Sequence, residues 1–165
     1  MQGITTFLWF DDQAEEAAEY YVRVFREMGR EDSAVTSVAR YGASGAAAAN
    51  RPEGSVMSVS FRLDGQDFGS VNGGPIFPFT EAISLVVNCS TQEEIDGFWE
   101  RLTDGGEEGP CGWCKDRHGL SWQIVPYELE QIIQAGDPEV SDRVMAEVLM
   151  MGKLDLATLE RAAQG

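Results

Sequence analysis

The residue types best suited to chemistry gather between positions 105 and 126. This stretch holds Cys111 and Cys114 in a Cys-x-x-Cys arrangement, followed by His118, the one histidine of the chain. A Cys-x-x-Cys pair works as a redox couple when a helix N-terminus lowers the pKa of its first thiol. A turn and then a strand pattern follow Cys114 instead, so the sequence favours a structural pair over a redox pair.

Zinc binding and acid–base catalysis are the other uses of these residues. Two thiols and one imidazole supply three ligands, whereas structural zinc takes four, and no fourth is evident. His118 lies within Asp-Arg-His-Gly, a composition typical of a tight turn, so we expect an exposed turn residue rather than a general base. We therefore expect neither a bound metal nor a cofactor.

A second group of residues could line a pocket for a small molecule. Aromatic rings supply apolar walls and can hold a flat or cationic ligand, while a few polar side chains fix its orientation. A carboxylate beside such rings could have a raised pKa. The candidates are Phe7, Trp9, Asn72, Glu81, Trp113, Trp122 and Gln123. The aromatic residues could equally belong to the hydrophobic core, and Glu81 could be a solvated residue at a strand end.

Composition narrows the possible partners. The chain has 165 residues and a net charge of −16, with 12 Lys and Arg against 28 Asp and Glu. Such a charge repels nucleic acid and anionic membranes, and no apolar run approaches the roughly 20 residues of a membrane helix. The N-terminus has no signal-peptide pattern, and three cysteines fit reduced thiols. We expect a cytoplasmic protein.

The first half of the chain carries one helix pattern among four strand patterns. Apolar residues at spacings of three and four predict the helix, and Asp64-Gly65 predicts a hairpin between the last two strands. Residues 42–54 are small and without periodicity, so we expect a long mobile loop there. The strands are expected at 4–10, 34–41, 55–63 and 66–72, and the helix at 12–27.

The second half repeats this order. Sliding the sequence by 77 residues places Leu8 on Leu85 and Tyr21 on Phe98 without a gap. A capping box at Ser90 to Glu93 predicts the helix start, and Phe68 and Trp122 take equivalent places after their glycines. Strands are expected at 81–88, 111–115 and 120–125, whereas residues 107–110 are turn-like. Helical patterns with an apolar face follow Pro126.

Two tandem βαβββ units resemble the vicinal oxygen chelate superfamily, which includes glyoxalases, bleomycin-resistance proteins and extradiol dioxygenases. The chain looks most like the PhnB-like branch, which also carries a 3-demethylubiquinone 3-methyltransferase domain name. The words that carry this resemblance are FLWFDDQAEEAAEYYVRVF, SVMSVSFRLDGQDFGSVNGGP, FTEAISLVVNC and CGWCKDRHGLSWQIVP. The resemblance implies an α+β domain over residues 1–126, with units 4–73 and 80–126 forming a curved mixed sheet around a cleft, and a helical extension over 127–165.

The resemblance also says where a metal would bind. Metal-dependent relatives take His, Gln or Glu ligands from the first and last strands of each unit. Leu8, Phe10, Leu85 and Val87 should face the helices, which leaves Thr5, Phe7, Trp9, Ala82, Ser84 and Val86 facing the cleft. Gln123 stands where an acidic ligand is expected, and its counterpart near Gly69 offers no ligand. Nor do the glycines form the strand-to-helix loop of a Rossmann methyltransferase.

We therefore expect a homodimeric protein that binds an unknown small molecule in its cleft without a metal. Two alternatives stay open at this stage. The first is a metal-dependent lyase, isomerase or dioxygenase that uses Glu81, Gln123 and further ligands. The second is a dimeric scaffold whose cleft is filled by its own side chains.

Overall fold

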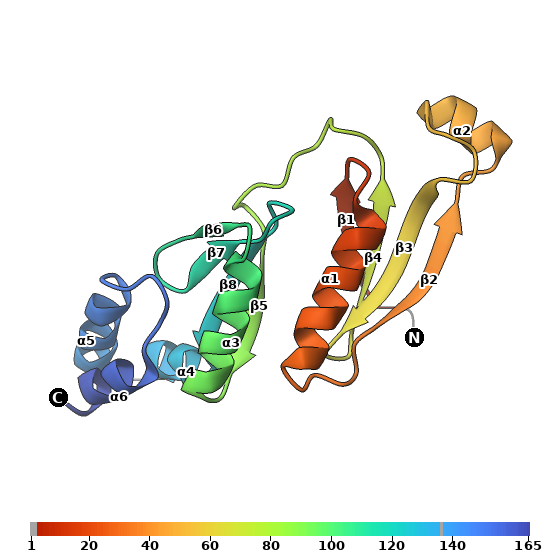
Figure 1. The fold of residues 1–165 in the computed structure, drawn as a ribbon. Helices are drawn as coiled ribbons and strands as arrows, with labels where there is room; N and C mark the ends of the chain where they lie inside the picture. The colour runs from red at the N-terminus through yellow and green to blue at the C-terminus, as the bar shows by residue number, and fades with distance from the viewer. Residues whose placement is uncertain (1–2, 136) are drawn as a thin grey trace. The chain divides into compact units, whose positions relative to one another are not determined.

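The computed structural model describes residues 3–135 and 137–165, which fold into two compact units, one up to Phe79 and one from Thr80 onwards. The first unit contains one four-stranded sheet in the order β1-β4-β3-β2, in which β1 runs parallel to β4 and the other pairs are antiparallel (Figure 1). Its elements are β1 (Thr6–Phe10), α1 (Ala14–Glu27), β2 (Ala34–Arg40), α2 (Ala43–Ala49), β3 (Val56–Leu63) and β4 (Gln66–Asn72).

The second unit repeats this topology. Its sheet has the order β5-β8-β7-β6, again with a parallel first pair, so the predicted pair of βαβββ units is confirmed. Its elements are β5 (Ser84–Cys89), α3 (Gln92–Thr103), β6 (Glu107–Glu108), β7 (Trp113–Lys115) and β8 (Ser121–Pro126). The C-terminal helices are α4 (Tyr127–Ala135), α5 (Pro138–Val148) and α6 (Leu156–Gln164).

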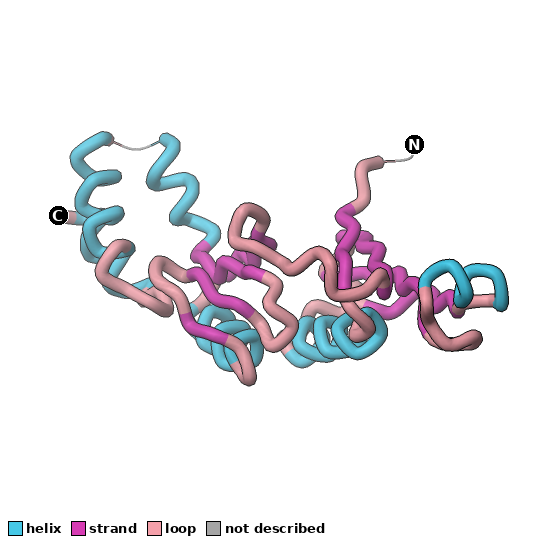
Figure 2. Tube along the Cα trace, turned by 90° about the horizontal axis from the view of Figure 1, so that it is seen from above, coloured by secondary structure: helices cyan, strands magenta, loops and turns pink. Residues whose placement is uncertain are grey.

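In each unit, one helix covers one face of the sheet (Figure 2). Tyr21 of α1 and Phe98 of α3 are fully buried, as the apolar spacing predicts. The predicted helix-facing residues Leu8, Phe10 and Val87 are buried too. We call the opposite side of each sheet its open face. Phe7 and Trp9 of β1 and Ser84 and Val86 of β5 lie there, as the alternation of side chains along a strand predicts.

Strand register refines the internal repeat. Leu8 pairs with Ser70 across the first sheet, and Leu85 pairs with Trp122 across the second. Trp122 is therefore equivalent to Ser70, and the predicted equivalence with Phe68 is wrong by two residues. For the same reason, the counterpart of Gln123 is Val71 rather than Gly69. The slip arises because the turn at Asp64-Gly65 is shorter than the turn that follows Lys115.

Three local predictions also need correction. The expected loop at 42–54 contains α2, because its alanines favour a helix, and Asn50 ends that helix in the left-handed conformation. The turn-like stretch at 107–110 begins with the short strand β6. The cap of α3 lies one residue later than expected, since Thr91 accepts the hydrogen bond from the Glu94 amide.

The C-terminal helices belong to the second unit. Val144 and Val148 of α5 pack with Leu154 and Leu159 into a small core. The segment before α6 is tied to the loop before β7, because the amides of Cys111 and Gly112 donate to the carbonyls of Met151 and Gly152, each at 2.7 Å. No helix within residues 3–135 and 137–165 has both the length and the apolar character needed to cross a membrane.

Candidate functional site

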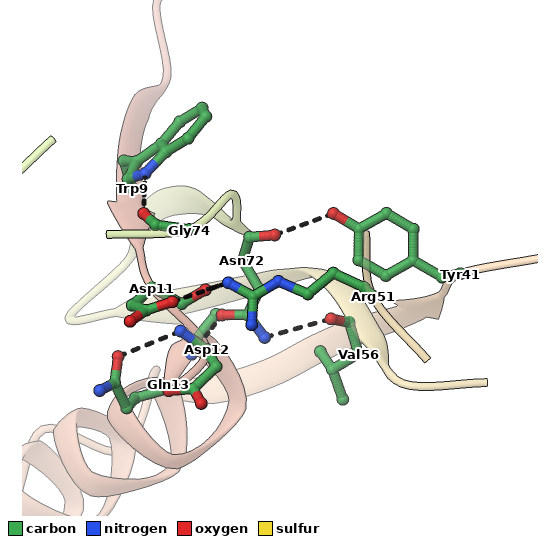
Figure 3. Close-up of polar contacts among 10 residues, drawn as sticks. Trp9, Asp11, Asp12, Gln13, Tyr41, Arg51, Val56, Asn72 and Gly74 are labelled. Carbon is green, nitrogen blue, oxygen red and sulfur yellow. Dashed lines mark hydrogen bonds and ion pairs between the residues drawn. The ribbon is translucent and has the colours of Figure 1, made fainter. Parts of the chain in front are cut away.

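The open face of the first sheet is occupied by its own aromatic rings. A Cβ atom added at Gly69 would lie 2.6 Å from Cδ2 of Phe7, so the Phe7 ring lies directly against the Gly69 backbone. The Trp9 ring lies against Gly73 in the same way, and its Nε1 donates to the Gly74 carbonyl at 2.8 Å (Figure 3). The absence of a side chain at Gly69 and Gly73 is thus what lets these rings lie against the backbone.

Asn72 lies on the other side of that sheet and is only 4% exposed. Its Oδ1 accepts from the amide of Ala14 at 2.8 Å, and its Nδ2 donates to the Val56 carbonyl at 3.1 Å (Figure 3). Its backbone carbonyl accepts from the Tyr41 hydroxyl at 2.8 Å. These contacts join β4 to the start of α1 and to β3, so the structure gives Asn72 an architectural role.

Arg51 follows α2 and reaches back to the end of β1. Its Nη2 donates to the carbonyl of Asp11 at 2.6 Å and to the Asp11 carboxylate at 2.7 Å (Figure 3). The pair is partly buried, and it fastens the α2 segment to the turn between β1 and α1. The charge of Arg51 is therefore used within the first unit.

The second unit contains a hollow of about 470 Å³. Its lining combines residues of β6, β7 and β8 with the loop between β6 and β7 and with Glu81, which precedes β5. The residues that line it are Glu81, Glu107, Glu108, Gly109, Pro110, Cys111, Trp113, Cys114, Lys115 and Ser121. Two of the predicted site residues, Glu81 and Trp113, are thus brought together with side chains that the sequence did not single out.

Glu81 and Lys115 form an ion pair at this hollow, with 2.5 Å between Oε1 and Nζ. The hydrogen bond to Lys115 lowers the pKa of Glu81, and the same bond raises the pKa of Lys115. Glu107, which pairs with Lys115 across the strands, raises the pKa of Lys115 further. Neither member of the ion pair is thus suited to exchange a proton near neutral pH. Both side chains are suited to stay charged in the wall of the hollow.

Gln123 lies on the same open face, opposite Trp113. Its Nε2 donates to the Ser84 hydroxyl at 2.8 Å, which joins β8 to β5. The side chain is half-buried and does not line the hollow. Gln123 therefore shapes the face beside the hollow through its bond to Ser84.

Trp122 lies in the core on the helix side and is 1% exposed. Its Nε1 donates to Oδ2 of Asp116 at 2.7 Å, while Oδ1 of Asp116 accepts from the amides of His118 and Leu120. The buried carboxylate thus organises the turn that contains His118. This role of Asp116 was not predicted from the sequence, although an Asp that opens a turn before Gly119 is a known signal.

The two cysteines of the Cys-x-x-Cys pair have different surroundings. Cys114 is 2% exposed, and burial raises its pKa to about 12, with the carboxylates of Asp116 and Glu108 as further causes. Cys111 is partly exposed and has a positive φ of 59°. A thioredoxin-type couple needs a lowered thiol pKa, so the environment of Cys114 supports the structural interpretation.

The residues on the open faces do not fit a divalent metal. Such an ion needs about three good ligands, chiefly imidazole, thiolate or carboxylate groups. Phe7, Trp9 and Val71 have no side-chain atom that binds a metal, and Ser84 and Gln123 are hydrogen-bonded to each other. Across the part of the chain that the structure describes, no group of three or more His, Cys, Asp or Glu residues is arranged to hold a metal.

Ser121 is the residue of the hollow that sequence reasoning missed most clearly. Gln123 follows Ser121 by two residues in β8, so strand alternation places both on the same face. The sequence therefore contained a signal for the position of Ser121. The same rule shows that the adjacent residues Trp122 and Gln123 cannot share one face. Lys115 was missed because a lysine near a turn is usually a solvated residue.

Comparison with known proteins identifies relatives of the whole βαβββ pair. A family model described as 3-demethylubiquinone-9 3-methyltransferase matches residues 2–125. A PhnB protein from Bacillus cereus with the same description is 35% identical, with a TM-score of 0.63, and the match covers 76% of this chain and 99% of that chain. No curated protein matches the chain.

More distant structures share the fold alone. Protein PA1353 from Pseudomonas aeruginosa is 16% identical, with a TM-score of 0.57, over 75% of this chain and 96% of that chain. A mutant of the fosfomycin resistance protein FosX from Listeria monocytogenes, solved with Mn(II) and 1S,2S-dihydroxypropylphosphonic acid, is 15% identical. Its TM-score is 0.57, and the match covers 81% of this chain and 99% of that chain.

Proposed function

The chain belongs to the PhnB-like family described as 3-demethylubiquinone-9 3-methyltransferase, within the glyoxalase superfamily. We propose that it binds a small molecule in the hollow of its second unit. One observation carries the proposal: the open face of β7 and β8 contains a hollow of about 470 Å³ that is lined by charged, aromatic and hydroxyl side chains. Ligand pockets typically measure about 300–1,000 Å³ and combine apolar walls with a few polar groups.

Each kind of lining residue has a part in this proposal. Trp113 and Pro110 supply apolar wall, the Glu81–Lys115 ion pair supplies fixed charge, and Ser121 supplies a hydroxyl. Gln123 holds Ser84 in place beside the hollow. Phe7 and Trp9 lie on the open face of the first unit and do not line the hollow.

The proposed binding does not require a metal, because the open faces lack a suitable ligand set. A metal-dependent lyase, isomerase or dioxygenase was the alternative that the fold resemblance raised. No arrangement of donors in the described residues favours it. The methyltransferase description of the family likewise has no counterpart in a glycine-rich strand-to-helix loop, since β1 is followed by Asp11 and Asp12 before α1.

We propose in addition that the protein is a cytoplasmic homodimer. β1 and β5 each form an edge of their sheet, and neither strand contains a charged residue. Sheets normally cover or protect such edges, and pairing with a second copy is one way to do so. Its three cysteines are thiols rather than disulfides, which supports a reducing compartment. Light scattering should give twice 18.1 kDa for the dimer, and a mass of 18.1 kDa would contradict it.

Cys111 offers a direct test of the binding site. It is the partly exposed cysteine, whereas Cys89 and Cys114 are buried, so iodoacetamide should modify Cys111 first. Cys111 lines the hollow, and an occupied hollow should therefore slow its alkylation. We expect at least one compound from a panel of small aromatic amines, acids and alcohols to slow the reaction severalfold, as followed by mass spectrometry.

A matched pair of variants locates the effect. Trp113→Ala should abolish the protection, while Trp9→Ala, which removes a tryptophan from the open face of the other unit, should preserve it. Protection by no member of the panel would overturn the proposal. Unchanged protection in Trp113→Ala would also overturn it.

A further inference from the structure

The side-chain hydroxyl of Ser121 lies at the hollow and has no hydrogen-bond partner there in the part of the chain that the structure describes. The residue is 1% exposed, and its Oγ has no hydrogen-bond partner among the described residues. A buried hydroxyl without a partner is unfavourable, so an atom that completes the bond would be stabilised. Ser121 lies on the open face between Ser84 and Lys115, which are its cross-strand neighbours, and it lines the hollow.

The charge around this hydroxyl is negative. Glu81, Glu107 and Glu108 line the hollow together with one cation, Lys115. The ammonium of Lys115 is already held by Glu81 at 2.5 Å, and Glu107 lies opposite it on β6. The Glu108 carboxylate accepts from Nε1 of Trp99 at 3.3 Å and lies towards the helix side. Glu81 and Glu107 against one ammonium still leave an excess of negative charge, in a chain whose net charge is −16. This field favours a cation and disfavours an anion.

The apolar wall suits an organic cation rather than a metal ion. Trp113 is half-buried and lines the hollow beside Pro110, so its indole can pack against a hydrocarbon or aromatic group. Indole rings also attract ammonium groups through the negative face of the π system. A bare metal ion would use neither the indole nor the proline.

We propose that the hollow binds an organic ammonium compound whose N–H group donates to the Ser121 hydroxyl while its apolar part packs against Trp113. This inference rests on the proposed function and names the chemical class of its ligand. The ammonium lies near Ser121 and Glu107, and the bound compound leaves the Glu81–Lys115 pair intact. Ser121 is then the residue that separates amines with an N–H from fully methylated ones.

Three probes of similar aromatic size test the proposal by calorimetry at pH 7. Benzylamine is a cation with N–H donors, benzyltrimethylammonium is a cation without them, and benzoate is an anion. We expect benzylamine to bind and benzoate to bind about tenfold more weakly or not at all. Ser121→Ala should weaken benzylamine by about threefold to tenfold, because one hydrogen bond is lost, and should leave benzyltrimethylammonium unchanged. Ser60→Ala, on the open face of the first unit, is the matched control and should change neither.

The outcomes separate this inference from the proposed function. Benzoate binding as tightly as benzylamine would overturn the ligand class, and an equal loss for both cations in Ser121→Ala would overturn the role of Ser121. If other compounds protect Cys111 but benzylamine does not bind, the hollow is a ligand site and the ammonium inference fails. If no compound protects Cys111, the proposed function itself fails.

Discussion

The two units share one topology but use their open faces differently. With the 77-residue offset, Phe7 is equivalent to Ser84, and Gly69 is equivalent to Ser121. In the first unit, the Phe7 ring lies against Gly69, although the residue is 64% exposed. In the second unit, two serines occupy these positions, and a hollow lies beside them. The comparison shows that the two units keep one strand arrangement while different side chains stand at equivalent positions of their open faces.

The faces of the two sheets that lie under the helices also differ, with smaller polar residues in the first unit and large apolar residues in the second. Ser70 and Asn72 of β4 are equivalent to Trp122 and Ile124 of β8. The first unit thus places polar residues under its helix, where Asn72 satisfies the amide at the start of α1. The second unit places large apolar residues there and moves its buried polar group to Asp116, in the turn before β8. Each unit therefore contains a buried polar side chain that accepts from backbone amides, at different positions in the two units.

The largest effect on binding is expected when the residues of the first open face replace their equivalents in the second. The double substitution Ser84→Phe with Ser121→Gly should place an aromatic ring over the hollow and abolish protection of Cys111 by any ligand. Far-UV circular dichroism should be unchanged, because both residues lie outside the helix-side core. The single substitution Ser84→Ala is the control that keeps the space, and it should retain binding. Full protection in the double variant would show that the ligand binds elsewhere.

The next largest effect concerns the helix sides. Trp122→Ala should lower the free energy of unfolding by about 3–5 kcal/mol, because it leaves a cavity and removes the indole donor from Asp116. Ser70→Ala, at the equivalent position, removes one hydrogen bond to the Val59 carbonyl and should cost about 1 kcal/mol. Urea denaturation followed by circular dichroism measures both. Equal losses would contradict the assigned register.

A smaller effect tests the packing of Phe7 on Gly69. Gly69→Ser introduces a Cβ atom 2.6 Å from the ring and should lower the free energy of unfolding by about 1–3 kcal/mol. Adding Phe7→Ser removes the ring and should recover part of this loss. A double-mutant cycle measures the coupling. Strictly additive effects would mean that the ring does not lie where the structure places it.

Ionisation of Cys114 is expected to have the smallest effect on the free energy of unfolding at neutral pH. Its pKa is raised from 9.0 to about 12 in the folded protein, so the folded state keeps a proton that the unfolded state loses. The resulting stability is complete below pH 9 and is lost as the pH rises towards 12. Stability of the native protein should therefore fall over this window more steeply than that of Cys114→Ala. Parallel curves for the two proteins would show that the thiol does not titrate as proposed.

Much of the fold follows from sequence pattern because burial alternates regularly along strands and helices. The faces of Phe7, Leu8 and Val87 were predictable from alternation alone. The equivalence of Trp122 with Ser70 was not, since the turns before β4 and β8 differ in length and glycine positions mislead the alignment. The two-residue strand β6 is too short to show periodicity.

The site was less predictable than the fold. Aromatic and acidic residues draw attention by type, so Trp113 and Glu81 were among the predicted residues and both line the hollow, whereas Ser121 looks ordinary in the sequence. The role proposed for it rests on the missing hydrogen-bond partner and on the hollow, which are properties of packing. For the same reason, the buried contacts of Asn72 and Trp122 could be recognised only in three dimensions.

The most direct test of the contrast between the two open faces uses the indole N–H signals of the four tryptophans. In a ¹H–¹⁵N NMR titration with benzylamine, the signal of Trp113 should shift and saturate. Signals of Trp9 on the open face of the first unit, and of the core residues Trp99 and Trp122, should move little. A saturating shift of Trp9 with Trp113 unchanged would contradict the account and place the ligand on the first unit.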